Sequence, residues 1–116
     1  ALNNFAYFLS LRNVDLDKAA NMSKRSIELD PGNPSNLDTY AWILYMKGDY
    51  LEAKKQILKS LELSPNNAEV VEHFGDILFR LKEVEGANVQ WKKAKVLGGS
   101  SNELELKIKN RSLPQN

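Results

Sequence analysis

The stretch ELDPGNP at residues 28–34 returns in altered form as ELSPNNA at residues 62–68. The two segments place Pro31 and Pro65 34 residues apart. A second position recurs with the same spacing and holds alanine each time, as Ala19, Ala53 and Ala87. Similarity at a fixed period of this length is typical of repeat proteins, in which each unit packs against its neighbours.

The residues of one period predict two helices. Apolar side chains recur near every 3.6 residues in both halves of the segment 34–67, as Leu37, Tyr40, Ala41 and Leu44 and then as Tyr50, Ala53, Ile57 and Leu61. Asn33 is typical of a residue that caps a helix start, and Gly48 of a helix end. Asp49 and Glu52 predict an acidic form of the capping box for the second helix. Each period is therefore expected to form a helix-turn-helix unit.

The same reading predicts three units and a final helix, which together form one domain over residues 1–112. The units are expected at about residues 1–33, 34–67 and 68–101. Ser100 or Ser101 can cap a last helix that runs over about residues 101–110. Its expected inward side chains are Leu104 and Ile108, and its basic residues near the negative helix end are Lys107, Lys109 and Arg111. We expect this helix to close the array with a polar surface and residues 113–116 to fray.

Composition excludes several classes of protein. The 116 residues are 42% hydrophobic and 27% charged, as in one ordinary globular domain. A net charge of +1 is far from the basic excess typical of nucleic-acid binding, and no apolar run approaches the ~20 residues of a membrane span. Cysteine is absent, so disulfides and thiolate sites are excluded. We expect a soluble protein, in the cytoplasm or the periplasm.

Four positions of the unit hold small residues or proline in register. At positions 8, 20, 27 and 32, the second unit has Ala41, Ala53, Ser60 and Pro65, the third has Gly75, Ala87, Ala94 and Gly99, and the first has Ala6, Ala19, Ser26 and Pro31. This pattern resembles the tetratricopeptide repeat (TPR) family over nearly the whole chain, with Gly99 departing from the expected proline. The chain also looks like the C-terminal repeats of a longer bacterial TPR protein.

The resemblance implies an all-α, right-handed α-solenoid of three TPR-like units plus a C-terminal capping helix. It also implies a concave face, lined by the first helix of each unit, that binds peptides or partner proteins. The aromatic and sulfur-containing side chains at the implied groove positions are Tyr7, Trp42, Tyr45, Met46 and Phe79. The charged or titratable ones are Asp38, Glu69, Glu72, His73 and Asp76.

These side chains suggest that the groove takes an extended or helical segment with apolar and basic residues. Aromatic rings offer large rigid contact areas, and carboxylates favour lysine or arginine. The alternative is that Trp42 and Tyr45 pack between neighbouring helices and that the carboxylates are only solvated. In this family, the clamp that binds the acidic C-termini of chaperones has lysine, asparagine or arginine at five positions. The corresponding residues of this chain are Asn3, Tyr7, Thr39, Glu69 and His73. The clamp is therefore not expected, and Glu69 would repel its ligand.

Neither a metal nor a catalytic site is expected. His73 and Asp76 have a spacing that could share a metal ion, but no second cluster of ligands accompanies them. No nucleophile elbow or phosphate-binding glycine loop is present. We therefore expect no cofactor and no enzymatic activity.

The N-terminal segment suggests a second hypothesis. Its apolar side chains leave little polar surface, and the ones we assign to self-association are Leu2, Phe5, Phe8 and Leu9. A solenoid end of this kind tends to pair with another surface. The chain also begins at Ala1 rather than at methionine. We therefore expect either upstream repeats or a homodimer, in which case the chain is a structural segment of a longer or self-associating solenoid.

Overall fold

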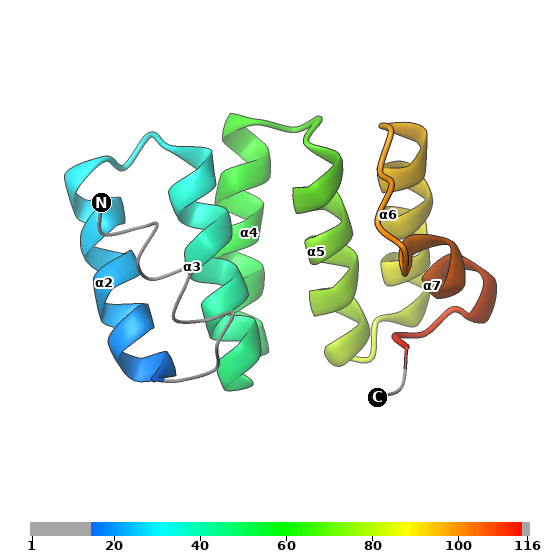
Figure 1. Cartoon of the computed structure of the whole chain (residues 1–116), viewed down its shortest axis with the longest axis horizontal. Helices are drawn as coiled ribbons and strands as arrows, with labels where there is room; N and C mark the ends of the chain where they lie inside the picture. Colours follow the sequence, from blue (N-terminus) through cyan, green and yellow to red (C-terminus); the bar gives the residue numbers. More distant parts are fainter. Residues whose placement is uncertain (1–14, 115–116) are drawn as a thin grey trace.

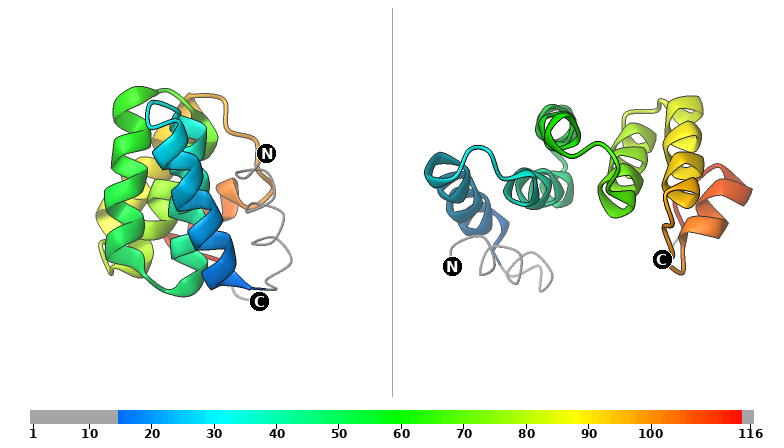
Figure 2. Two further views of the ribbon diagram at one scale, coloured as in Figure 1. Left: turned by 90° about the vertical axis from the view of Figure 1, so that its left-hand side faces the viewer. Right: turned by 90° about the horizontal axis from the view of Figure 1, so that it is seen from above.

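The computed structural model describes residues 15–114, and over that range its regular structure is entirely helical. The helices are α2 (Leu16–Leu29), α3 (Pro34–Lys47), α4 (Tyr50–Leu63), α5 (Ala68–Arg80), α6 (Val84–Val96) and α7 (Leu104–Asn110). Each helix packs mainly against the next one in the sequence (Figure 1). Seen from above, the helices zigzag along the long axis of the molecule (Figure 2). This arrangement confirms the predicted all-α solenoid, with α3 and α4 as the second unit and α5 and α6 as the third.

The helix ends follow the predicted signals with one exception. The Asn33 side chain accepts hydrogen bonds from two backbone N–H groups of the first turn of α3, at 2.9 and 3.2 Å. Gly48 adopts the left-handed conformation after α3, with φ of 87°. The predicted capping box at α4 is wrong, because the Asp49 side chain makes no capping hydrogen bond. The Glu52 carboxylate instead accepts from Gln56 Nε2 at 2.9 Å.

Small residues allow the two helices of a unit to cross closely. Five alanines at the recurring positions have no exposed surface, namely Ala19, Ala41, Ala53, Ala87 and Ala94. A Cβ atom added to Gly75 would lie 2.5 Å from the ring of Trp91, so only glycine fits there. At the remaining small position of the second unit, the Ser60 hydroxyl donates a hydrogen bond to the Pro34 carbonyl at 2.8 Å. This bond links α4 to the start of α3.

The core consists of two main clusters that meet at α5. The cluster between α3, α4 and α5 contains Ala41, Leu44, Ala53, Ile57, Val70 and Ile77. The cluster between α5, α6 and α7 contains Val71, Leu78, Ala87, Trp91, Ala94 and Leu104. Adjacent residues of α5 point to different clusters because each residue turns the helix by about 100°. Helix α5 is therefore held on both sides and leaves a third side for a binding surface.

The C-terminal segment closes the described array, as predicted, but by more contacts than expected. Helix α7 begins at Leu104, and Ser101 Oγ accepts from the Leu104 backbone N–H at 3.1 Å in the turn before it. Leu104 is buried and Ile108 packs against the second cluster. Lys107 is also buried, however, so α7 is not a merely polar cover. Leu113, in the segment predicted to fray, packs against the same cluster.

Several predicted residues fall outside the described part of the chain. They are Leu2, Phe5, Tyr7, Phe8 and Leu9, together with residues 115–116. Among the helices of residues 15–114, none combines the length and apolar character that crossing a membrane requires.

Candidate functional site

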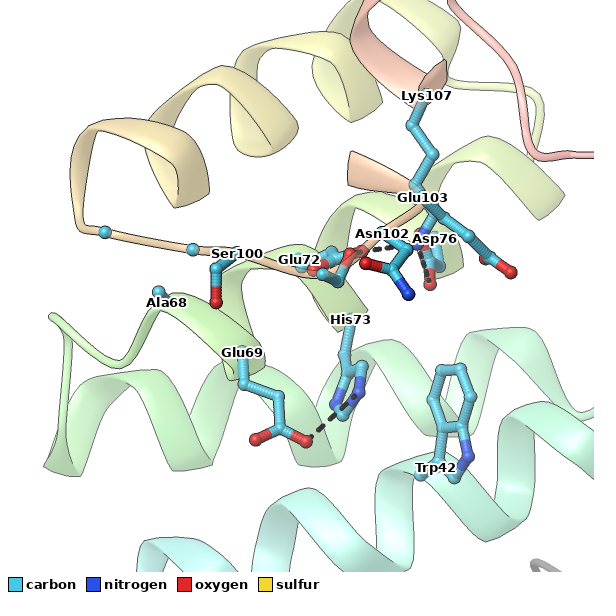
Figure 3. A pocket seen from close by; sticks show the side chains of 13 residues that line it. Trp42, Ala68, Glu69, Glu72, His73, Asp76, Ser100, Asn102, Glu103 and Lys107 are labelled. Carbon is cyan, nitrogen blue, oxygen red and sulfur yellow. Dashed lines mark hydrogen bonds and ion pairs between the residues drawn. The ribbon is translucent and has the colours of Figure 1, made fainter. Parts of the chain in front are cut away.

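A groove of about 620 Å³ runs along α5, between α3 and the segment that connects α6 to α7. Figure 3 shows this groove from close by. Five predicted residues line it, namely Trp42, Glu69, Glu72, His73 and Asp76. The opposite wall consists of residues 98–103 together with Lys107. The structure thus brings half of the predicted binding residues into one cavity.

A second hollow of about 210 Å³ adjoins the groove toward the C-terminal end of α5. The two share four lining residues, which are Trp42, Asp76, Glu103 and Lys107. The second hollow adds Tyr45, Arg80, Leu113 and Pro114. Arg80 Nε donates to the Tyr45 hydroxyl at 3.3 Å, which joins α5 to α3 at this end. The two hollows together form a continuous surface along one side of α5, which we call the α5 groove.

His73 connects α5 to α3 inside the α5 groove. Its Nδ1 atom lies 2.9 Å from Asp38 Oδ1, and its Nε2 atom lies 4.0 Å from Glu69 Oε1. The imidazole stacks on the Trp42 ring with 4.3 Å between the centroids. Trp42 in turn stacks on Tyr45 at 4.8 Å, with only 12° between the ring planes. The three rings form a preorganised aromatic surface whose orientation is set by contacts from two helices.

The surroundings of His73 favour its charged form. Burial alone would lower the pKa of the imidazole. The hydrogen bond to Asp38 and the negative charges of Asp38, Asp76 and Glu69 outweigh burial and raise this pKa above its ordinary value. A larger fraction of His73 is therefore protonated near neutral pH than in a free histidine.

A buried ion cluster forms the wall of the groove next to α7. Lys107 Nζ lies 2.6 Å from Glu72 Oε2 and 3.1 Å from Asp76 Oδ1. The three side chains are between 5% and 9% exposed. The Trp91 indole donates to Asp76 Oδ1 at 3.0 Å, and the Ser101 hydroxyl donates to Glu72 Oε2 at 2.8 Å. The cluster therefore ties α7 and its preceding turn to α5 and α6.

The charges of this cluster support one another. Burial lowers the pKa of Lys107, but the charge of Asp76 and the contacts with Glu72 raise it above its ordinary value. Burial raises the pKa of Asp76 more than the contacts with Lys107 and Trp91 lower it. Lys107 is therefore a charged partner, and the carboxylates of Glu72 and Asp76 are engaged inside the protein.

The predicted carboxylates thus differ in what they offer a ligand. Asp38 is held by His73, and Glu72 and Asp76 are held by Lys107. The Glu69 side chain is 72% exposed, and its only ion-pair contact within residues 15–114 is the 4.0 Å approach to His73. Glu69 is therefore the predicted carboxylate that is most available to a partner.

Three of the described predicted residues lie outside the lining of the groove, and Asp38 is connected to it through His73. Phe79 packs against the second core cluster, and its ring lies 6.0 Å from that of Trp91. Met46 is half-buried on α3 and belongs to neither hollow.

The sequence analysis missed groove residues that come from outside the first helix of a unit. They come from the segment after α6 and include Asn102, Glu103, Leu113 and Pro114, and the burial of Lys107 was not expected either. A spacing of 35 residues could have revealed part of this arrangement. It separates Asp38 from His73, Glu72 from Lys107 and Tyr45 from Arg80, and each pair is in contact.

The described acidic and histidine side chains do not form a metal site. Over residues 15–114, no group of three or more histidine, aspartate or glutamate residues has an arrangement that could hold a metal ion. The carboxylates along α5 have lysine and histidine partners instead.

Comparison with protein families and curated proteins gives two related matches. The family model described as "Anaphase-promoting complex, cyclosome, subunit 3" matches residues 12–90. The "TPR repeat-containing protein PA4667" of Pseudomonas aeruginosa is 30% identical over 76 residues. This alignment covers 66% of the chain but 13% of the bacterial relative. The chain therefore spans about an eighth of the length of this relative.

Solved structures share the fold. The first TPR domain of Spaghetti (RPAP3), bound to the HSP90 peptide SRMEEVD, matches with a TM-score of 0.87 and 15% identity over 95% of this chain and 86% of that one. The Sgt2 TPR domain from Aspergillus fumigatus has a TM-score of 0.86 and 17% identity, over 95% of this chain and 74% of that one. The Arabidopsis OM64 TPR domain has a TM-score of 0.85 and 16% identity, over 94% and 90%. At these identities the likeness concerns the arrangement of helices.

Proposed function

Because the chain belongs to the tetratricopeptide repeat family, we propose that it is a non-catalytic interaction module that binds a peptide or a segment of a partner protein in the α5 groove. The observation that carries this proposal is the groove of about 620 Å³ with the stacked Trp42 ring and the exposed Glu69 carboxylate in its lining. Fixed aromatic rings supply binding energy at little cost in conformational entropy. The Spaghetti domain, which has the same fold, is a peptide-bound example.

The charge of the groove favours a different ligand from the HSP90 peptide. The peptide SRMEEVD contains three acidic residues. In this chain, Glu69 occupies the position at which the family's clamp for such peptides has a lysine. Glu103 is a second exposed carboxylate in the lining of the groove. Like charges placed opposite each other oppose binding, whereas basic side chains are attracted. The partner segment therefore carries basic and apolar residues.

Calorimetric titration with short peptides tests this function. A peptide with lysine and leucine residues is expected to bind the wild-type chain, and Trp42→Ala is expected to weaken binding by roughly tenfold or more. Added salt is also expected to weaken binding, because the carboxylates at the rim are exposed. Leu58→Ala is the matched control, since this apolar side chain is 44% exposed on α4, away from the groove.

Two results separate this proposal from a loss of folding. Helical circular dichroism and the thermal midpoint of each variant identify any variant that has unfolded. Glu69→Gln changes an exposed side chain and is expected to weaken binding without affecting either quantity. Unchanged affinity in both Trp42→Ala and Glu69→Gln would reject the α5 groove as the binding surface.

A second candidate function is a structural role within a longer or self-associating solenoid. The observation that favours it is the length of the bacterial relative, of which the chain covers 13%. In this case the apolar residues of the N-terminal segment would dock against further repeats or a second copy. Sedimentation equilibrium tests this role, since a dimer that Phe8→Glu disrupts would support it. A chain that stays monomeric at high concentration would exclude self-association.

A further inference from the structure

The two ends of the α5 groove differ in charge. Glu69 lines the hollow near the N-terminal end of α5, and Arg80 lines the hollow near the C-terminal end. Both side chains are exposed. Arg80 Nε donates to the Tyr45 hydroxyl, and no ion pair of Arg80 occurs among residues 15–114. The groove thus has an acidic end and a basic end.

The other charged residues of the groove leave the difference in charge between its two ends in place. Lys107 lies between Glu72 and Asp76, so this buried cluster offers no free cation to a ligand. Glu103 belongs to both hollows and is exposed, and it forms no ion pair with the described residues. A ligand therefore meets free carboxylates along the first hollow and where the two hollows join, and a guanidinium at the far end of the second.

The distance between the ends sets the length of the ligand. Glu69 and Arg80 are eleven positions apart on one helix, which corresponds to a rise of about 16 Å and to nearly the same face. An extended peptide covers this distance with about five residues. Between the ends, the apolar surface consists of Trp42 and Tyr45 together with Leu113 and Pro114 from the C-terminal segment.

We infer that the α5 groove binds an extended segment of about five residues with a lysine or arginine at one end, apolar side chains in the middle and a carboxylate at the other end. The basic end lies toward Glu69 and Glu103, and the carboxylate lies toward Arg80. This inference rests on the proposed function and adds to it the direction in which the segment lies. The direction follows from the charges at the two ends, which reject a segment placed the opposite way.

Four capped peptides test the inference by calorimetry. They share three central apolar residues and carry lysine or glutamate at each end, in all four combinations, so only the end charges differ. The tighter of the two mixed peptides is expected to bind wild type roughly fivefold more tightly than either the double-lysine or the double-glutamate peptide. Arg80→Glu is expected to transfer the preference to the double-lysine peptide, and Glu69→Lys combined with Glu103→Lys to the double-glutamate peptide.

Control variants and outcomes distinguish this inference from the proposed function. Arg25→Glu on α2 and Glu62→Lys on α4 make the same charge changes at exposed positions away from the groove, and they should leave the order of affinities unchanged. If the double-lysine peptide binds wild type as tightly as the better mixed peptide, and Trp42→Ala weakens it, the direction is wrong and the proposed function holds. If none of the four peptides binds wild type, both proposals fail.

Discussion

Two junctions between successive units use the same repeat positions with different chemistry. At the first, Asp38 and Trp42 of α3 hold His73 of α5. At the second, Glu72 and Asp76 of α5 hold Lys107 of α7. Residues at the same place in the two junctions are 34 positions apart in the sequence. In both cases a carboxylate contacts a basic side chain that lies 35 positions further along the chain.

The difference between the junctions begins in the core of the third unit. The second unit has Ala41 and Ile57 at the positions where the third has Gly75 and Trp91. The larger Trp91 ring fits because Gly75 has no Cβ, and its buried N–H needs an acceptor. Asp76 supplies that acceptor at 3.0 Å. A buried carboxylate in turn requires a positively charged partner. A lysine on α7 meets this requirement, since it does not titrate near neutral pH.

The largest expected effect comes from removing the lysine of the second junction. Lys107→Met leaves Glu72 and Asp76 buried without a cation, which is expected to lower the free energy of unfolding by about 3 kcal/mol. Urea denaturation followed by circular dichroism measures this loss. Lys109→Met is the control on the same helix, since Lys109 is exposed, and it should change stability little. Adding Asp76→Asn to Lys107→Met should recover part of the loss, because asparagine remains an acceptor for Trp91.

A smaller effect is expected from giving the third unit the small residue of the second. Gly75→Ala places a methyl group 2.5 Å from the Trp91 ring, and overpacking of this kind is expected to destabilise the chain by about 2 kcal/mol. The same change in a Trp91→Ile background should be neutral or stabilising, because isoleucine accompanies alanine in the second unit. A penalty that persists in that background would show that Trp91 is not the reason for Gly75.

Another glycine gives an effect of opposite sign. Gly86 lies inside α6, and an added Cβ would meet only Leu78 Cδ1 at an ordinary distance of 3.5 Å. Gly86→Ala is therefore expected to raise the free energy of unfolding by about 0.7 kcal/mol, since alanine is the better helix former. Thermal and urea denaturation of this variant beside Gly75→Ala test whether contact distance alone separates the two glycines. Destabilisation by Gly86→Ala would contradict the packing described for α6.

The smallest expected effect is the pH dependence of the first junction. The pKa of His73 is raised in the folded chain, so its protonation stabilises the fold. This contribution is fully present below the unfolded-state pKa of about 6.5 and is lost as the pH rises through the higher folded-state pKa. The difference in unfolding free energy between wild type and His73→Gln should therefore shrink as the pH rises through that window. A difference that is constant over this range would mean that His73 does not titrate in contact with Asp38.

The sequence allowed the units, the helix caps and the closing helix to be predicted because these features depend on local chemistry. Asn33, Gly48 and Ser101 act on their own turns, and the recurring alanines act at every crossing of two helices. The α5 groove was predicted only in part, because its lining depends on how one unit is rotated against the next. Phe79 instead faces Trp91 within its own unit, and Glu103 and Pro114 reach the groove from the segment after α6, which lies outside the repeat pattern.

The charged residues of the groove were also predicted only in part from the sequence. Helical periodicity can place Glu72 and Asp76 on one side of α5, but it does not show that Lys107 buries them. Burial of three ionisable groups requires that they meet with good geometry, which is a property of the assembled units. The contact pairs spaced by 35 residues are a signal of this assembly, because each joins a position of one unit to the next position of the following unit.

One measurement tests the central claim, that a partner segment binds in the α5 groove, most directly. The chain has two tryptophans, one of which lines the groove while the other is fully buried in the core. In a two-dimensional ¹H–¹⁵N NMR titration with the better mixed-charge peptide, the indole N–H signal of Trp42 is predicted to shift progressively and that of Trp91 to stay nearly constant. Saturable binding that leaves the Trp42 signal unmoved, with shifts confined to α2, α4 or the outer side of α6, would contradict the claim.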